Sequence, residues 1–194
     1  MRYKAVEPAE CMNCAEQVLG DERSPSNLRA WATLCRGWAL TSLEQIHASL
    51  AAHQAIGSPM GRPHFLAVLA DALAGAGNVA GGLAALGDAF EVMKSTGQRY
   101  YEAELSRLSG ELFVKSGELA RAEFYFQEAL RIAREQGARS LELRGAIGLS
   151  RLWRTQGKQK QAAALLAGVY SGFVEGFETA DLSQARILIE EMAG

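Results

Sequence analysis

Glycine recurs at a fixed interval along most of this chain. It occupies positions 37, 57, 77, 97, 117, 137 and 157, one every 20 residues, and Gly176 lies one place off the series. Helix-length segments with a 3.6-residue hydrophobic period lie between these glycines. Glycine is the usual residue just past a helix, because it adopts the left-handed conformation without a Cβ penalty. The spacing therefore predicts paired helices, one pair for each 40 residues.

Three of these pairs superpose on one another. Segments 66–97, 106–137 and 146–177 each carry a small residue on the first helix and another on the second. On the second helix, a larger apolar residue follows the small one four positions later, and a third residue follows three positions after that. The small residues of the first helices are Ala70, Gly110 and Ser150; the sets on the second helices are Gly82, Leu86, Ala89, then Ala122, Phe126, Ala129, then Ala162, Leu166, Val169. The spacing i, i+4, i+7 lines one helical face, where small residues let two backbones approach. Phe126 is therefore predicted to be a core residue and not part of a ligand-binding aromatic site.

This constellation resembles the tetratricopeptide repeat, best over 103–136. That family's repeat is about 34 residues long, and HEAT-type pairs run nearer to 40, so HEAT-like stacking stays open as an alternative. The small–large–small signature and the short turns favour the tetratricopeptide type. We expect an all-α, right-handed solenoid of antiparallel helix pairs, closed by a C-terminal capping helix.

The expected organisation is one helical-repeat domain over 1–194. A helix over 9–19 lacks a partner, and a one-faced helix over 181–192, with Asp181 as its N-cap, closes the array as solenoids require. The segment 26–57 is irregular: either Gly37 marks the turn of a hairpin, or one helix continues past Gly37 and the turn near 41–43 is shortened. The regular pairs are predicted over 63–97, 99–137 and 139–176.

Charge and hydropathy exclude several classes of protein. The formal charge is −2, so the chain lacks the excess of basic residues that is typical of proteins that bind nucleic acid or an anionic membrane. The N-terminus has no apolar stretch of the secretory type, and the most apolar segment, 65–77, is short and carries Asp71, so it cannot span a bilayer. The three cysteines form no disulfide framework. We therefore expect a cytoplasmic protein.

No motif in the sequence predicts catalysis, a cofactor or a metal. Cys11 and Cys14 form a lone CxxC without the further ligands of a zinc site, and we interpret them as small apolar residues on one helical face, or as a redox-sensitive dimer contact if that face is exposed. His47, His53 and His64 are dispersed. Walker A and GxSxG patterns are absent from the 194 positions. The sequence therefore predicts a protein that is not an enzyme.

The resemblance to tetratricopeptide arrays implies that the first helix of each pair lines a concave groove. Arginines recur there with helical spacing, and guanidinium groups bind carboxylate or phosphate in a bidentate fork. Glu104 and Arg144 lie one 40-residue period apart, so they are expected at the same level of adjacent helix pairs, and the same holds for Glu111 and Arg151. Ion pairs between these residues would compete with a ligand for the two arginines. Arg154 has no acidic residue level with it and is the best candidate for an external anion. The candidate groove residues are Arg107, Glu111, Lys115, Arg144, Arg151 and Arg154.

A closer resemblance covers roughly 28–192. Segments 61–73, 96–112, 137–144, 150–158 and 176–191 are similar to the C-terminal repeat region of bacterial multidomain signalling proteins, in which a cyclase-like domain and a P-loop ATPase come first. Related arrays occur in LuxR-type activators. The resemblance implies an interaction or sensor array, as a fragment or as a free-standing relative, and carries no catalytic residue over.

We therefore expect a non-enzymatic scaffold or regulatory array that binds a polypeptide, or itself as a homodimer through the N-terminal helices. The alternative is an array that senses a small anionic ligand and regulates an attached or associated ATPase or cyclase.

Overall fold

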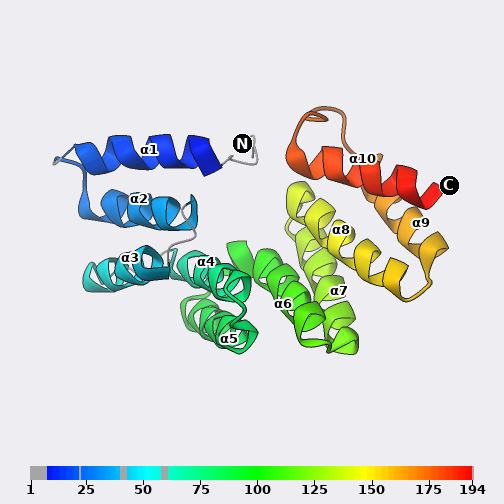
Figure 1. Cartoon of the computed structure of the whole chain (residues 1–194), viewed down its shortest axis with the longest axis horizontal. Helices are drawn as coiled ribbons and strands as arrows, with labels where there is room; N and C mark the ends of the chain where they lie inside the picture. The colour runs from blue at the N-terminus through cyan, green and yellow to red at the C-terminus, as the bar shows by residue number, and fades with distance from the viewer. Residues whose placement is uncertain (1–7, 22, 40–42, 58–60, 194) are drawn as a thin grey trace. The chain divides into compact units, whose positions relative to one another are not determined.

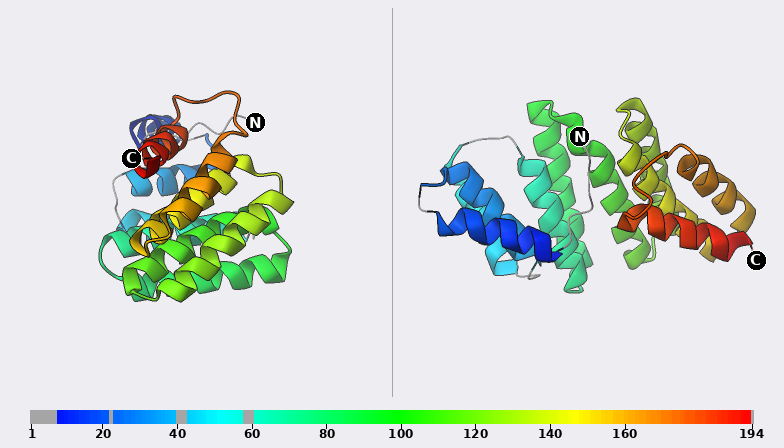
Figure 2. Two further views of the ribbon diagram at one scale, coloured as in Figure 1. Left: turned by 90° about the vertical axis from the view of Figure 1, so that its right-hand side faces the viewer. Right: turned by 90° about the horizontal axis from the view of Figure 1, so that it is seen from above.

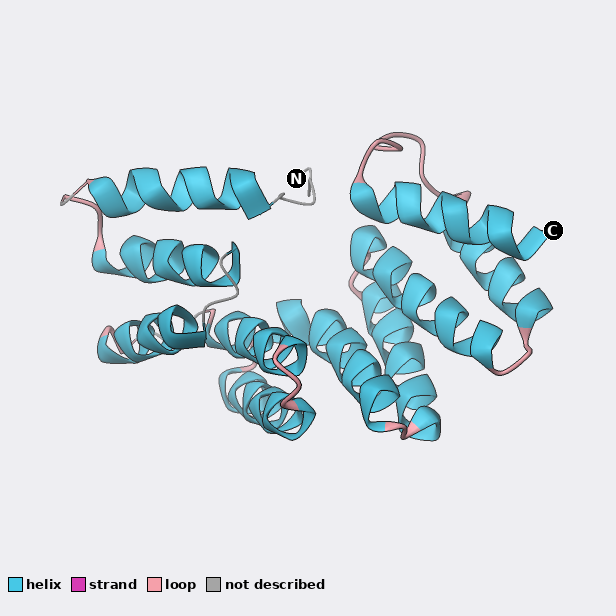
Figure 3. Cartoon of the chain, in the orientation of Figure 1, coloured by secondary structure: helices cyan, strands magenta, loops and turns pink. Residues whose placement is uncertain are grey.

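The computed structural model describes residues 8–21, 23–39, 43–57 and 61–193, and every regular element among them is helical (Figures 1 and 3). The helices form two compact units, Val6–Tyr101 and Glu102–Gly194, so one repeat domain over 1–194 stays a prediction. The first unit contains α1 (Pro8–Gly20), α2 (Ser26–Ala39), α3 (Leu43–Ala55), α4 (Arg62–Gly75), α5 (Val79–Thr96) and a 3-10 turn, η1 (Arg99–Tyr101). The second contains α6 (Glu102–Ser116), α7 (Leu119–Glu135), α8 (Arg139–Thr155), α9 (Gln159–Tyr170) and α10 (Ala180–Ala193).

The first unit differs from expectation at its beginning. The sequence predicts a helix over 9–19 without a partner, whereas α1 packs against α2, which in turn packs against α3 (Figure 1). The fully buried Ala15 lies on the helix α1 that makes this contact, and a small side chain permits close approach of two backbones. The inference that α1 presents an uncovered face therefore loses its basis.

Segment 26–57 forms two helices, α2 and α3, that pack against each other. Gly37 lies inside α2, so it does not mark the turn. Residues 40–42, which include most of the predicted shortened turn, lie outside the described residues.

Contacts between aromatic rings join several helices of the first unit. The ring of Phe65 in α4 is completely buried and lies 4.6 Å from the ring of Trp31 and 4.5 Å from that of His53, centroid to centroid. His64 lies 5.0 Å from Trp31 and 4.7 Å from Tyr101. Both histidines thus pack against aromatic rings, which join α2, α3 and α4 with η1.

In the second unit, α6 pairs with α7 and α8 with α9, while α10 packs against both α8 and α9 (Figures 1 and 2). The cap helix begins at Ala180, one residue before the predicted N-cap, so Asp181 lies in its first turn. There a carboxylate still interacts favourably with the helix dipole. Its buried face is apolar: Leu182, Ala185, Leu188 and Met192.

The predicted crossing residues of the second unit are buried. Ala122, Ala129, Ser150, Ala162 and Leu166 have no exposed surface. The Ser150 hydroxyl donates to the Ala162 carbonyl at 3.1 Å, which joins α8 to α9 at their crossing and satisfies a buried polar group.

Phe126 is a core residue, as predicted, and its ring lies between two glycines. It is 1% exposed. A Cβ placed on Gly110 of α6 would come within 2.8 Å of the ring, and one on Gly148 of α8 within 2.4 Å. The ring of Phe126 on α7 therefore occupies space that side chains on α6 and α8 would fill if Gly110 and Gly148 were larger residues.

The fourth pair is shorter than the sequence suggests. The helix α9 ends at Tyr170, whereas the predicted pair extends to 176. Val169 is only half-buried, although its equivalents Ala89 and Ala129 have no exposed surface. The backbone leaves the helix after Tyr170, and Ser171 and Gly172 form a turn.

Seven of the eight predicted turn glycines have left-handed backbone angles, with φ between 63° and 83° for Gly57, Gly77, Gly97, Gly117, Gly137, Gly157 and Gly176. At Gly117 an added Cβ would meet no atom within 4 Å. Gly61, outside the series, has φ 84°, and its Cβ would lie 2.4 Å from the Trp31 ring.

A carboxylate joins three helices of the second unit. Glu123 of α7 accepts from the indole N–H of Trp153 at 2.8 Å, and from the Nζ of Lys158 at 3.2 Å. The hydrogen bond from Trp153 is the main cause that holds the pKa of Glu123 below its usual range, with Lys158 adding to it.

Candidate binding site

The candidate residues lie on α6 and α8, which pack against each other in the second unit. Glu102 and Glu104 occupy the first turn of α6, and Lys115 its last turn, an arrangement that complements the helix dipole. Arg154 occupies the last turn of α8. We call the following side chains the charged strip: Glu104, Arg107, Glu111 and Lys115 of α6, Arg144, Arg151 and Arg154 of α8, and Glu191 of α10.

A buried ion pair anchors the charged strip. Arg107 donates from Nε to Oε2 of Glu104 and from Nη2 to Oε1, both at 2.9 Å. The two residues are 6% and 3% exposed. Arg144 of α8 approaches the same carboxylate, with Nη1 2.8 Å from Oε1. The predicted pairing of Glu104 with Arg144 is therefore present, and it joins the two first helices.

The second predicted pair does not form. Glu111 accepts from Nη1 of Arg107, one turn earlier on the same helix. Residues four apart on a helix are neighbours, so this carboxylate has a nearer guanidinium than the one on α8. Arg151 is exposed and has no hydrogen bond or ion pair with any residue in the described part of the chain.

Arg154 has no acidic residue level with it, as predicted, but it is not left free for an external anion. Its Nη1 lies 2.6 Å from Oε2 of Glu191 on the cap helix. The 40-residue period places Glu191 level with Arg151, but the long side chain of Arg154 reaches the carboxylate from three residues along α8. Glu191 is therefore the ion-pair partner of Arg154.

The charged strip carries more positive than negative charge. Its five cationic side chains outnumber its three carboxylates, and one of these carboxylates, Glu104, forms ion pairs with two arginines. Among the described residues, Lys115 and Arg151 have neither ion pair nor hydrogen bond from their side chains. The strip can therefore accept an anionic group at Arg151 beside arginines whose positions are already fixed.

The other sequence candidates do not gather into a site. Cys14 is exposed and free, so the small apolar interpretation does not hold for it, and the side chain of Cys11 lies outside the described residues. No group of three or more histidine, cysteine, aspartate or glutamate side chains within 8–21, 23–39, 43–57 and 61–193 is placed to hold a metal ion. None of the helices described has the length and apolar character needed to cross a membrane.

Comparison with known proteins identifies the fold. No family model matches the chain, and no curated protein matches it. The crystal structure of the apo form of RapI superposes with a TM-score of 0.63 at 11% identity, covering 93% of this chain and 52% of RapI. The chain thus spans about half the length of that structure. At this identity the likeness concerns the fold alone, and it agrees with the helix pairs: the chain has a tetratricopeptide-like helical-repeat fold.

Proposed function

We propose that the chain is a non-enzymatic interaction module whose charged strip binds an acidic segment of a polypeptide partner. The helical-repeat fold supports an interaction or regulatory role, since stacked helix pairs present extended surfaces. The observation that carries the choice of ligand is Arg151, an exposed guanidinium without a partner among the described residues, beside arginines that are held in place.

The surrounding ion pairs favour this role of Arg151. Glu104 holds the buried Arg107 in place, while the partly exposed Arg144 and Arg154 form ion pairs with Glu104 and Glu191 that a ligand can share. Arg151 contributes its whole bidentate fork to an external carboxylate. An acidic peptide fits better than a single small anion, because Lys115 and the half-exposed Arg144 extend the positive surface.

Fluorescence anisotropy with a labelled decaglutamate peptide tests the proposal. Arg151→Glu should weaken its binding at least about tenfold, because it replaces attraction with repulsion at the ligand. Arg131→Glu is the matched control: Arg131 is on α7, pairs with Glu128 and Glu135, and lies outside the charged strip. Its change should be small, and decalysine should not bind. Equal losses in the two variants, or tight decalysine binding, would contradict the proposal.

A small anionic ligand is the second candidate, supported by the same unpaired arginine. Citrate serves as its probe, and a rise in melting temperature that Arg151→Glu abolishes, without decaglutamate binding, would favour this alternative. In that case the module would regulate an attached or associated ATPase or cyclase. A pull-down from host lysate, with Arg151→Glu as the comparison bait, then separates a polypeptide partner from a metabolite.

Self-association through the N-terminal helices stays a prediction. Its original reason was an unpaired helix, and α1 is paired with α2. Asn13, Cys14, Glu16 and Gln17 make the exposed side of α1 polar. Analytical ultracentrifugation at several concentrations tests it directly, and a constant monomer mass would exclude it.

A further inference from the structure

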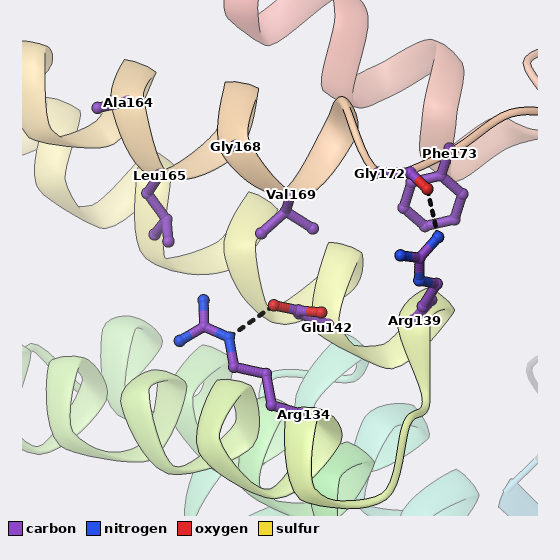
Figure 4. A pocket seen from close by; sticks show the side chains of 9 residues that line it. All are labelled: Arg134, Arg139, Glu142, Ala164, Leu165, Gly168, Val169, Gly172 and Phe173. Carbon is purple, nitrogen blue, oxygen red and sulfur yellow. Dashed lines mark hydrogen bonds and ion pairs between the residues drawn. The ribbon is translucent and has the colours of Figure 1, made fainter.

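A second candidate site lies on α9, apart from the charged strip. A pocket of about 350 Å³ opens between the end of α7, the start of α8 and the second half of α9 (Figure 4). Its apolar wall includes Leu165, Val169 and Phe173, all half-buried. The lining combines this apolar wall with charged side chains, a combination that suits a ligand with both an apolar and a charged part.

The pocket exists because α9 carries glycines where the preceding hairpin carries side chains. Gly168 and Gly172 line it, and the residues forty positions earlier are Glu128 and Ile132. Ile132 is buried in a cluster with Ala103. At Gly172 no such side chain exists, and a Cβ on Gly168 would meet no atom within 4 Å. The missing side chain at Gly168 therefore leaves open space, whereas at Gly172 the Arg139 guanidinium lies 3.5 Å from the position that a Cβ would take.

The polar side of the pocket carries two guanidinium groups and one carboxylate. Nε of Arg134 lies 2.6 Å from Oε1 of Glu142, and Arg139 donates to the carbonyl of Gly172. Each guanidinium has five N–H donors, and the contacts of the described residues leave most of them unused. The net charge of these three side chains is positive. In Figure 4, Arg134 and Glu142 lie opposite Leu165 and Val169, and Arg139 lies beside Gly172 and Phe173.

We propose that this pocket binds an amphipathic monocarboxylate, a molecule with one carboxylate and an unbranched apolar tail. The carboxylate pairs with the guanidinium of Arg139, which keeps N–H donors beyond the one that it gives to the carbonyl of Gly172, while Arg134 and Glu142 lie further along the pocket (Figure 4). The tail lies along Leu165, Val169 and Phe173, in the space above Gly168. A cationic ligand is disfavoured, because it would place its charge beside two arginines.

Octanoate is the probe, and octylamine and octanol are its charge controls. Octanoate should cause saturable amide chemical-shift changes in residues of α9 and the start of α8, while the two controls should not. Arg139→Gln should weaken octanoate binding about tenfold, the effect of losing one charge-assisted hydrogen bond of about 1.4 kcal/mol.

A variant that fills the pocket tests its location. Gly168→Leu should abolish octanoate binding while the fold is retained, because the new side chain enters open space. Gly87→Leu on α5 is the matched control, since a Cβ at Gly87 also meets no atom within 4 Å, and it should bind octanoate normally. Circular dichroism melts of both variants verify folding.

Three results would overturn this assignment: equal binding of octanoate and octylamine, unchanged binding by Gly168→Leu, or unchanged binding by Arg139→Gln. The assignment is independent of the charged strip, because Gly168→Leu should leave decaglutamate binding intact and Arg151→Glu should leave octanoate binding intact. A loss of both ligands in either variant would show instead that the unit had been perturbed as a whole.

Discussion

Replacing Gly148 by alanine should destabilise the protein, although the same substitution within a helix ordinarily stabilises it. The new Cβ would lie 2.4 Å from the ring of Phe126, which cannot retreat because Gly110 already approaches it from α6. Overpacking of this kind costs about 1–3 kcal/mol. The gain from helix propensity is roughly 0.5–1 kcal/mol, so a net loss of about 1–2 kcal/mol is expected.

Urea unfolding followed by circular dichroism measures this effect against an internal control. Gly168→Ala lies on α9 of the same unit and meets no atom, so it should gain about 0.5–1 kcal/mol. In a Phe126→Leu background, Gly148→Ala should become neutral or stabilising, which gives a coupling free energy of about 1–3 kcal/mol between the two positions. The packing argument fails if Gly148→Ala stabilises as much as Gly168→Ala, or if the coupling is zero.

The ion pairs lead to further predictions. Glu104→Gln should cost about 3 kcal/mol in urea unfolding, because the buried guanidinium of Arg107 loses the buried one of its two carboxylate partners and keeps the more exposed Glu111. Arg144→Gln, at a residue whose side chain is 36% exposed, should cost less than about 1 kcal/mol, and equal losses would refute this ranking. Trp153→Phe tests the lowered pKa of Glu123. A carboxylate with a lowered folded-state pKa stabilises above its unfolded pKa and loses that stability as pH falls, so Trp153→Phe should be less stable than the wild type at pH 7 and converge with it near pH 3. A gap between the two melting temperatures that persists at pH 3 would exclude this cause.

The sequence predicts the fold well because its strongest signals are local. A glycine that ends a helix depends on the backbone angle of one residue, and the small residues at each crossing recur with the period. Gly37 shows the limit of this reasoning. It lies on the 20-residue series but inside α2, because periodic placement does not distinguish a helix end from a helix interior.

The charged strip was predicted only in part, for a geometric reason. A 40-residue shift identifies which backbone positions are level, and it correctly joined Glu104 to Arg144. It cannot follow a long side chain along the helix, which is how Arg154 reaches Glu191. The sequence does not predict the pocket on α9, because its signal is an absence: Gly168 and Gly172 stand where the preceding hairpin carries Glu128 and Ile132.

The glycines with positive φ differ in which substitutions they tolerate. At Gly117 the added Cβ would meet nothing, so the position requires a backbone angle alone, and asparagine, which tolerates positive φ better than most residues, is an acceptable substitute. At Gly61 the Trp31 ring excludes any side chain as well. Over evolutionary time the regular glycines can therefore be lost one by one while the helix pairs persist, and distant relatives of this chain need not show the spacing that makes its own repeats visible.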